Sequence, residues 1–268
     1  MEILGLISAI AIGLTLGLIG GGGSILTVPA LVYLLSIEPV PATAYSLFIV
    51  GLTALIGSIA FMKKNLVSYK TAVIFAIPSF IAVFLTRKFI IPAIPDTIIT
   101  FGTIDITKDL FLMVLFAVLM LASSISMIKK RKSDAEISDD KEPEFNYPMI
   151  FLEGLVVGVL TGLVGAGGGF LIIPALVILA KLPMKLAVGT SLLIIAAKSL
   201  IGFGGDIGNM PIDWLFLVKF SAFAVGGILL GSYLTKYISN AKLKPAFGWF
   251  VLVMGFYILT REIYTTIT

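Results

Sequence analysis

Two short glycine-rich segments carry the residues of this sequence that are best suited to bind a small anion. The first is Gly20–Gly23, followed by Ser24, and the second is Gly165-Ala166-Gly167-Gly168-Gly169. A helix that starts within a membrane exposes backbone N–H groups without intrahelical partners, and its dipole places partial positive charge at the same end. Because glycines let an anion approach these N–H groups closely, each segment predicts the start of an anion-binding helix. Close helix packing is the competing interpretation.

Lys198 is the second chemically informative feature, because it stands inside the apolar segment LLIIAAKSLIGF. A charged side chain within a membrane costs at least a few kcal/mol and is a candidate functional group. Its ammonium group would balance the charge of a bound anion. Lys198 also lies about five residues from the expected helix end, so it could instead extend its ammonium outward to the interface.

Hydroxyl side chains complete the predicted site. Ser24 can cap its own helix or donate to a ligand, and Ser46, Thr190 and Ser191 stand at the starts of later apolar segments. They could bind an oxyanion, although hydrogen bonding to a local carbonyl is the commoner role. The predicted substrate-binding residues are Gly20, Gly21, Gly22, Gly23, Ser24, Ser46, Thr53, Gly165, Gly167, Gly168, Gly169, Thr190, Ser191 and Lys198.

The composition predicts an all-α polytopic membrane protein. Of the 268 residues, 59% are apolar and 13% are charged, against about 25% charged in a typical soluble protein. A helix of about 20 mostly apolar residues spans the hydrocarbon core, and such stretches recur along the chain. The apolar runs are continuous and do not alternate, so helices are expected and a closed barrel is not. We expect a multi-pass protein of the cytoplasmic membrane, surrounded by the lipid bilayer.

The absence of cysteine and histidine limits the chemistry. It excludes disulfides, Cys/His zinc sites and Ser-His or Cys-His catalysis, so we expect no enzyme, metal or other cofactor. An intramembrane enzyme with a Ser-Lys dyad, pairing Lys198 with Ser199 or Ser191, is the alternative from another class. A channel is a third, which the scarcity of polar residues in the apolar spans disfavours. The net charge of +4 indicates basic cytoplasmic loops and no nucleic-acid binding.

The chain consists of two halves with related sequences. Gly17–Val32 aligns with Gly162–Val177 at an offset of 145 residues, and 10 of these 16 positions are identical. The same offset aligns Thr53 with Lys198. Internal repeats are common in secondary transporters. We predict a single membrane transport domain that comprises repeat 1 at 1–128, a charged cytoplasmic linker at 129–146 and repeat 2 at 147–268.

Each half opens with an apolar stretch that is too long for one crossing, at 3–36 and at 149–180. As a straight helix, each would reach roughly 50 Å, against a hydrocarbon core of about 30 Å. The simplest interpretation is a helical hairpin that reverses at the glycines, and the alternative is one broken helix that crosses once. With three further transmembrane helices in each half, hairpins give inverted repeats and single crossings give parallel repeats.

The charges of equivalent loops favour inverted repeats. Loops rich in Lys and Arg in one half have acidic or charge-balanced equivalents in the other, as the positive-inside rule expects when orientation alternates. Both termini are predicted outside; Arg87 and Lys88 fit this less well, because they would lie near the outer face. The glycine turns would then meet near the bilayer midplane, where broken helices place substrate sites. The loops predicted to be cytoplasmic are 62–70, 129–148, 181–185 and 236–244.

At these residues the sequence resembles the TauE/SafE sulfite exporter family, also called the toluene-sulfonate uptake permease family. The family pattern is two copies of G-x-G-G-G-x-x-x-x-P, each followed by an A-x-x-T/x-S helix start. Tyr45 departs from the pattern, because it stands where the second copy has Thr190. The resemblance covers essentially all of the chain except 129–146. The two copies are Gly20 to Pro29 with Ala42 and Ser46, and Gly165 to Pro174 with Ala187, Thr190 and Ser191.

The resemblance implies transport of small sulfur-containing anions, such as sulfite or organosulfonates, across the cytoplasmic membrane. The residues by themselves predict only a small anionic substrate. The prediction is therefore a secondary transporter of such an anion, with a transporter or channel for another small anion as the alternative and an intramembrane enzyme as a weaker one. The direction of transport, a coupling ion (proton or sodium) and assembly as a homo-oligomer stay open.

Overall fold

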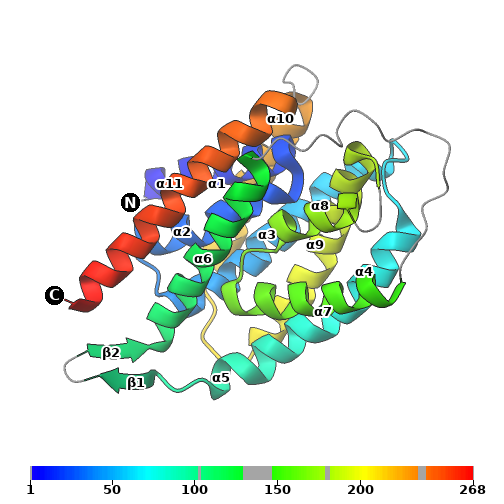
Figure 1. Cartoon of the computed structure of the whole chain (residues 1–268). Helices are drawn as coiled ribbons and strands as arrows, with labels where there is room; N and C mark the ends of the chain where they lie inside the picture. Colours follow the sequence, from blue (N-terminus) through cyan, green and yellow to red (C-terminus); the bar gives the residue numbers. More distant parts are fainter. Residues whose placement is uncertain (1, 102–103, 129–146, 179–181, 235–239, 268) are drawn as a thin grey trace.

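The structure is a computed structural model that describes residues 2–101, 104–128, 147–178, 182–234 and 240–267. Most of these residues are helical (Figure 1). The predicted linker at 129–146 lies outside the described residues. The helices are α1 (Glu2–Ile19), η1 (Gly20–Leu26), α2 (Thr27–Pro29), η2 (Ala30–Leu34), α3 (Pro39–Met62), α4 (Tyr69–Leu85), η3 (Thr86–Ile90), α5 (Ile91–Ala93), α6 (Lys108–Ile128), α7 (Tyr147–Val164), α8 (Gly169–Ile178), α9 (Met184–Asp206), α10 (Trp214–Leu234) and α11 (Asn240–Ile267).

Helices of the second half begin at the same relative positions as those of the first. Both ends of α7 lie 145 residues after the ends of α1, and α9 and α10 begin 145 residues after α3 and α4. One offset therefore aligns three helix starts as well as the glycine segments. This agreement supports the predicted division into two repeats.

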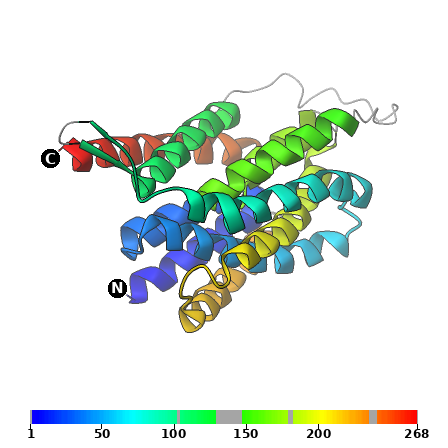
Figure 2. The same ribbon diagram turned by 90° about the horizontal axis from the view of Figure 1, so that it is seen from below.

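The two halves pack their helices against each other. α1 lies along α10, α7 along α4, α3 against α9 and α6 against α11, and α6 and α11 cross along one flank of the bundle (Figures 1 and 2). A Cβ added at Gly13 would meet the backbone of Ala224, and one at Gly158 would lie 2.6 Å from the carbonyl oxygen of Ser79. Gly13 and Gly158 are repeat mates, and so are Ser79 and Ala224, because each pair is 145 residues apart. Both repeats therefore use the same small-residue packing.

Helices α3 and α9 are equivalent in the two repeats and run antiparallel. A Cβ added at Gly51 would lie 2.9 Å from Cγ of Leu200. One added at Gly57, further along α3, would lie 3.8 Å from Cδ1 of Leu192, which comes earlier in α9. Equivalent helices meet in this way when the two-fold axis lies across them, as it does in inverted repeats. The contact supports the inverted arrangement, and its orientation in a membrane stays a prediction.

Several described helices have the length and hydropathy of membrane spans, which confirms the prediction of a helical multi-pass membrane protein. Five can cross a membrane by length and composition, and Ile3–Ile19, Gly23–Leu34 and Phe151–Val164 are shorter apolar helices. The five spans among the described residues are Pro39–Met62, Tyr69–Ala93, Lys108–Ile125, Lys185–Asp206 and Trp214–Leu234.

A short antiparallel hairpin departs from the all-helical prediction. Strand β1 (Thr97–Phe101) pairs with β2 (Ile104–Thr107) between α5 and α6. Both strands are rich in threonine and isoleucine, which favour extended structure. The hairpin and both ends of the described chain lie at the same end of the molecule (Figures 1 and 2).

Candidate binding site at the glycine turns

The first glycine turn reverses the chain after α1. Gly20 has a φ of +71°, a left-handed conformation that glycine adopts without steric cost. After the turn, a Cβ at Gly23 would lie 2.8 Å from Oγ1 of Thr15. A Cβ at Gly5, near the start of α1, would lie 2.9 Å from Cδ2 of Leu35. Segments before and after the turn thus lie side by side, so this half contains the predicted hairpin.

The second glycine turn connects α7 to α8 and uses more left-handed backbone. Gly165 has a φ of +70°, nearly the same as its repeat mate Gly20, and Gly167 and Gly168 have φ values of +65° and +66°. A residue with a Cβ would be strained at each of these three positions. Figure 1 shows α8 running back in the direction opposite to α7. The run of glycines is therefore required by the backbone of this turn.

At the start of α8, the first N–H groups of the helix precede its backbone hydrogen bonds. The N–H groups of Leu171 and Ile172 both donate to the carbonyl oxygen of Gly168 at 3.0 Å. Those of Gly169 and Phe170 come before this first helical bond, so the helix does not use them. They lie at the N-terminal end of α8, where the helix dipole places partial positive charge.

The tips of the two hairpins are in direct contact. A Cβ added at Gly21 would lie 2.6 Å from Cα of Gly169, and one at Gly169 would meet the backbone of Gly21. A Cβ at Gly167 would lie 3.4 Å from Cβ of Ser24. All four residues are buried. The expected approach of the tips is confirmed, whereas their place near the bilayer midplane stays a prediction; the surroundings of Gly22 lie outside what the structure describes.

Lys198 points at the second turn. Its side chain is fully buried, and Nζ donates to Oγ1 of Thr161 in α7 at 3.0 Å. A Cβ added at Gly168 would lie 2.5 Å from this Nζ and would also meet the Thr161 hydroxyl. In the described part of the chain, Lys198 forms no ion pair with a carboxylate. The alternative in which Lys198 extends outward to the interface is therefore wrong.

Most of the predicted hydroxyl residues are buried and bonded to nearby carbonyl groups. Ser24 donates to the carbonyl of Gly21 at 2.7 Å. Thr53 and Ser191 donate to the carbonyl groups of Ile49 at 2.6 Å and Val188 at 2.8 Å in their own helices. Ser46 is buried, and its Oγ has no hydrogen-bond partner among the described residues.

Thr190 and Tyr45, which occupy equivalent positions in the two repeats, both accept a hydrogen bond from a backbone N–H group. Oγ1 of Thr190 accepts a hydrogen bond from the N–H of Ser68 at 2.9 Å. The phenol oxygen of Tyr45 accepts one from the N–H of Asp213 at 2.9 Å. Ser68 and Asp213 are themselves 145 residues apart and each precedes an equivalent helix. The apparent departure of Tyr45 from the hydroxyl pattern therefore preserves a contact that holds the next loop.

A buried ion pair lies next to the second turn and was not predicted from the sequence. Arg87, in η3, is fully buried, and its Nε donates to Oδ1 and Oδ2 of Asp206 at 2.9 and 2.7 Å. Its Nη1 donates to Oγ1 of Thr43 at 3.0 Å and to the carbonyl oxygen of Gly162 at 3.2 Å. One signal was present, because Arg87 and Asp206 have opposite charges and end apolar spans predicted to finish on the same side.

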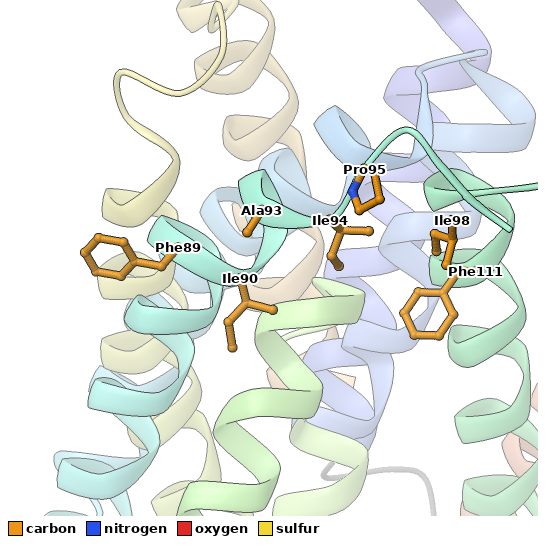
Figure 3. Close-up of a pocket in the computed structure, with 7 residues that line it drawn as sticks. All are labelled: Phe89, Ile90, Ala93, Ile94, Pro95, Ile98 and Phe111. Atoms are coloured by element: carbon orange, nitrogen blue, oxygen red, sulfur yellow. The ribbon is translucent and has the colours of Figure 1, made fainter.

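A pocket of about 560 Å³ lies apart from the turns, at η3, α5 and the start of α6. Figure 3 shows its lining side chains, which carry no charge. Such a lining suits apolar chains and gives no counter-charge for an anion. The lining residues are Phe89, Ile90, Ala93, Ile94, Pro95, Ile98 and Phe111.

Internal repeats and helices broken within the membrane are features of polytopic membrane transporters. This chain has both, together with a buried cation where its two hairpins meet. The family model described as "Sulfite exporter TauE/SafE" matches residues 5–258. The chain therefore belongs to the TauE/SafE sulfite exporter family.

Related proteins support the same class. The chain is 30% identical over 254 residues to a "Probable membrane transporter protein" of Xylella fastidiosa (strain 9a5c), covering 94% of this chain and 92% of that protein. It is 27% identical over 278 residues to the "Probable membrane transporter protein YunE" of Bacillus subtilis (strain 168), covering 99% and 98%. No solved structure matches the chain. The protein is thus a multi-pass membrane transporter and not an enzyme.

Proposed function

We propose that this protein is a secondary transporter of a small sulfur-containing anion, such as sulfite or an organosulfonate, which binds where the two glycine turns meet. The observation that carries the proposal is the position of Lys198. Its ammonium group is fully buried against the turn at Gly168, with a hydroxyl group as its hydrogen-bond partner. A buried charge without an opposite charge is costly, and a bound anion would offset that cost.

The start of α8 supports the anionic character of the substrate. The N–H groups of Gly169 and Phe170 precede the helical hydrogen bonds, and the helix dipole adds partial positive charge there. An oxyanion at this position would accept hydrogen bonds from the backbone and from Lys198 together. The family description, which names sulfite, supports sulfur as the central atom of the substrate.

The close contact between the tips supports alternating access. The backbones at Gly21 and Gly169 leave no room for even one additional carbon atom, and both residues are buried. Under the proposal, the anion enters when the hairpins move apart and leaves when they separate toward the other side. This packing favours a carrier over a channel, because a channel needs a continuous pore.

Transport by purified protein in proteoliposomes tests the proposal. We expect saturable counterflow of sulfite or of a sulfonate, in a panel that also contains sulfate, thiosulfate and carboxylates. Lys198→Gln should weaken binding of the transported anion by about 1.5–3 kcal/mol, the range for hydrogen bonds to charged groups. Lys219→Gln is the matched control, because it removes the same charge from an exposed position on α10. Unchanged counterflow in Lys198→Gln would rule out the proposed role of Lys198.

A further inference from the structure

One buried hydrogen-bond donor of Arg87 has no acceptor in the part of the chain that the structure describes. Its Nε is bonded to Asp206 and its Nη1 to Thr43 and Gly162, but Nη2 is buried and has no partner among the described residues. Buried donors on charged groups are nearly always satisfied in folded proteins. An unused guanidinium nitrogen therefore points to an acceptor that is present in another state of the protein.

The guanidinium group lies close to the same turn as Lys198. Lys198 bonds to the side chain of Thr161, and Arg87 bonds to the carbonyl oxygen of the next residue, Gly162. Thr43, which also accepts from Arg87, packs against the turn, since a Cβ at Gly165 would lie 2.5 Å from Cα and Cβ of Thr43. Two buried cations thus contact consecutive residues of α7, just before the second turn.

The chemistry of Arg87 suits an oxyanion. A guanidinium group is planar and presents its N–H groups in a fork that matches two oxygens of a carboxylate, phosphate or sulfur oxyanion. In this structure the oxygens come from Asp206, which belongs to the end of α9. A sulfite or sulfonate group offers the same pair of oxygens, and its third oxygen can accept from an N–H group that a carboxylate leaves unpaired.

We propose that Arg87 is a second anion-binding residue of the transporter, and that the Asp206 carboxylate occupies it when the transported anion is absent. This inference rests on the proposed transport of a sulfur oxyanion. The site lies at the ends of the α4 and α9 spans, which the topology prediction places outside, so the anion meets Arg87 on its path between the outer solution and Lys198. Asp206 balances the positive charge of the buried guanidinium between transport cycles.

Asp206→Asn tests the exchange directly, because it removes the competing charge and leaves Arg87 in place. We expect this variant of the purified full-length protein to bind sulfite or methanesulfonate about tenfold more tightly than wild type, the equivalent of one additional charge-assisted hydrogen bond. Asp213→Asn is the control, since it neutralises an exposed carboxylate in the adjacent loop. Equal affinities in Asp206→Asn and wild type, or the same gain in Asp213→Asn, would overturn the proposal.

Arg87→Lys keeps the test informative if Asp206→Asn does not fold. Lysine keeps the ion pair with Asp206 but lacks the planar fork, so we expect the KM for sulfite counterflow to rise about tenfold while protein yield is retained. A wild-type KM would show that Arg87 serves only as a structural partner of Asp206, and would overturn the proposal.

Combination with Lys198→Gln separates this inference from the proposed function. If Lys198→Gln weakens binding and Asp206→Asn has no effect, the second site fails and the proposed function stands. If Asp206→Asn tightens binding equally on the wild-type and Lys198→Gln backgrounds, the second site stands whatever Lys198 does. If no protein binds sulfite or methanesulfonate, both proposals fail.

Discussion

The two glycine turns share a sequence pattern but differ in what surrounds them. In the first, the left-handed Gly20 begins a 3-10 helix, and Gly23 packs against the backbone of its own hairpin arm. In the second, three glycines are left-handed, and Gly168, the repeat mate of Gly23, packs against the ammonium group of Lys198. The first turn thus packs against its own hairpin, whereas a buried cation lies against the second.

The charged residues near the second turn have uncharged repeat mates. Lys198 aligns with Thr53, whose hydroxyl group bonds within its own helix, and Asp206 aligns with Phe61. The glycine contacts between helices and the loop contacts of Tyr45 and Thr190 are nevertheless shared by both halves. The repeat thus provides a symmetric scaffold, and the groups suited to an anion gather at one of its two turns.

The largest expected effect concerns the orientation of the two halves. Cysteines at Lys64 and Ile207, both exposed and in equivalent loops, should lie on opposite sides of the membrane if the repeats are inverted. We expect an impermeant maleimide to label Ile207→Cys in intact cells and Lys64→Cys only after permeabilisation. The native sequence has no cysteine, so each signal reports one position. Labelling of both positions from the same side would mean parallel repeats.

A second prediction compares Gly168 with Gly23, the glycine at the equivalent position of the first repeat. Gly168→Ala places a Cβ at Lys198 and Thr161 in a left-handed conformation that costs about 1–2 kcal/mol. A ligand that binds only the folded state raises the melting temperature. Gly168→Ala should abolish this increase for sulfite. Gly23→Ala clashes with its own hairpin, so it should lower the melting temperature and keep the ligand-induced shift.

Gly204→Ala is the control for both glycine variants, because a Cβ there has no neighbour within 4 Å. It should resemble wild type in stability and in its response to sulfite. A full ligand-induced shift in destabilised Gly168→Ala would mean that the second turn, like the first, serves packing.

The smallest expected effect concerns the hydroxyl groups that the two halves share. Tyr45→Phe and Thr190→Val each remove an acceptor from the N–H group of a loop residue, Asp213 or Ser68. Each should lower the free energy of unfolding by about 1 kcal/mol and leave sulfite affinity unchanged. Thermal unfolding with and without sulfite measures both quantities. A loss of sulfite affinity in Thr190→Val alone would mean that Thr190 contacts the substrate.

The features that the sequence predicted well are those that repeat. Glycines at equivalent positions and apolar stretches too long for one crossing predicted the hairpins and the contact between their tips. The direction of Lys198 could not be predicted, because its partner Thr161 lies 37 residues away on another helix. Arg87 and Asp206 are separated by 119 residues, so only the fold shows that they meet. The threonine- and isoleucine-rich strands before α6 were missed because they follow neither the apolar spans nor the repeat.

The exchange of helices between the halves also has a consequence for biogenesis. α1 packs along α10 and α7 along α4, so each half covers one face of the other half's first helix. During synthesis α1 enters the membrane long before Trp214–Leu234 leaves the ribosome. Until then its glycine face has no partner, and the nascent chain depends on lipid or on insertion factors to cover it. Separately expressed halves should therefore accumulate only when they are made together in one cell.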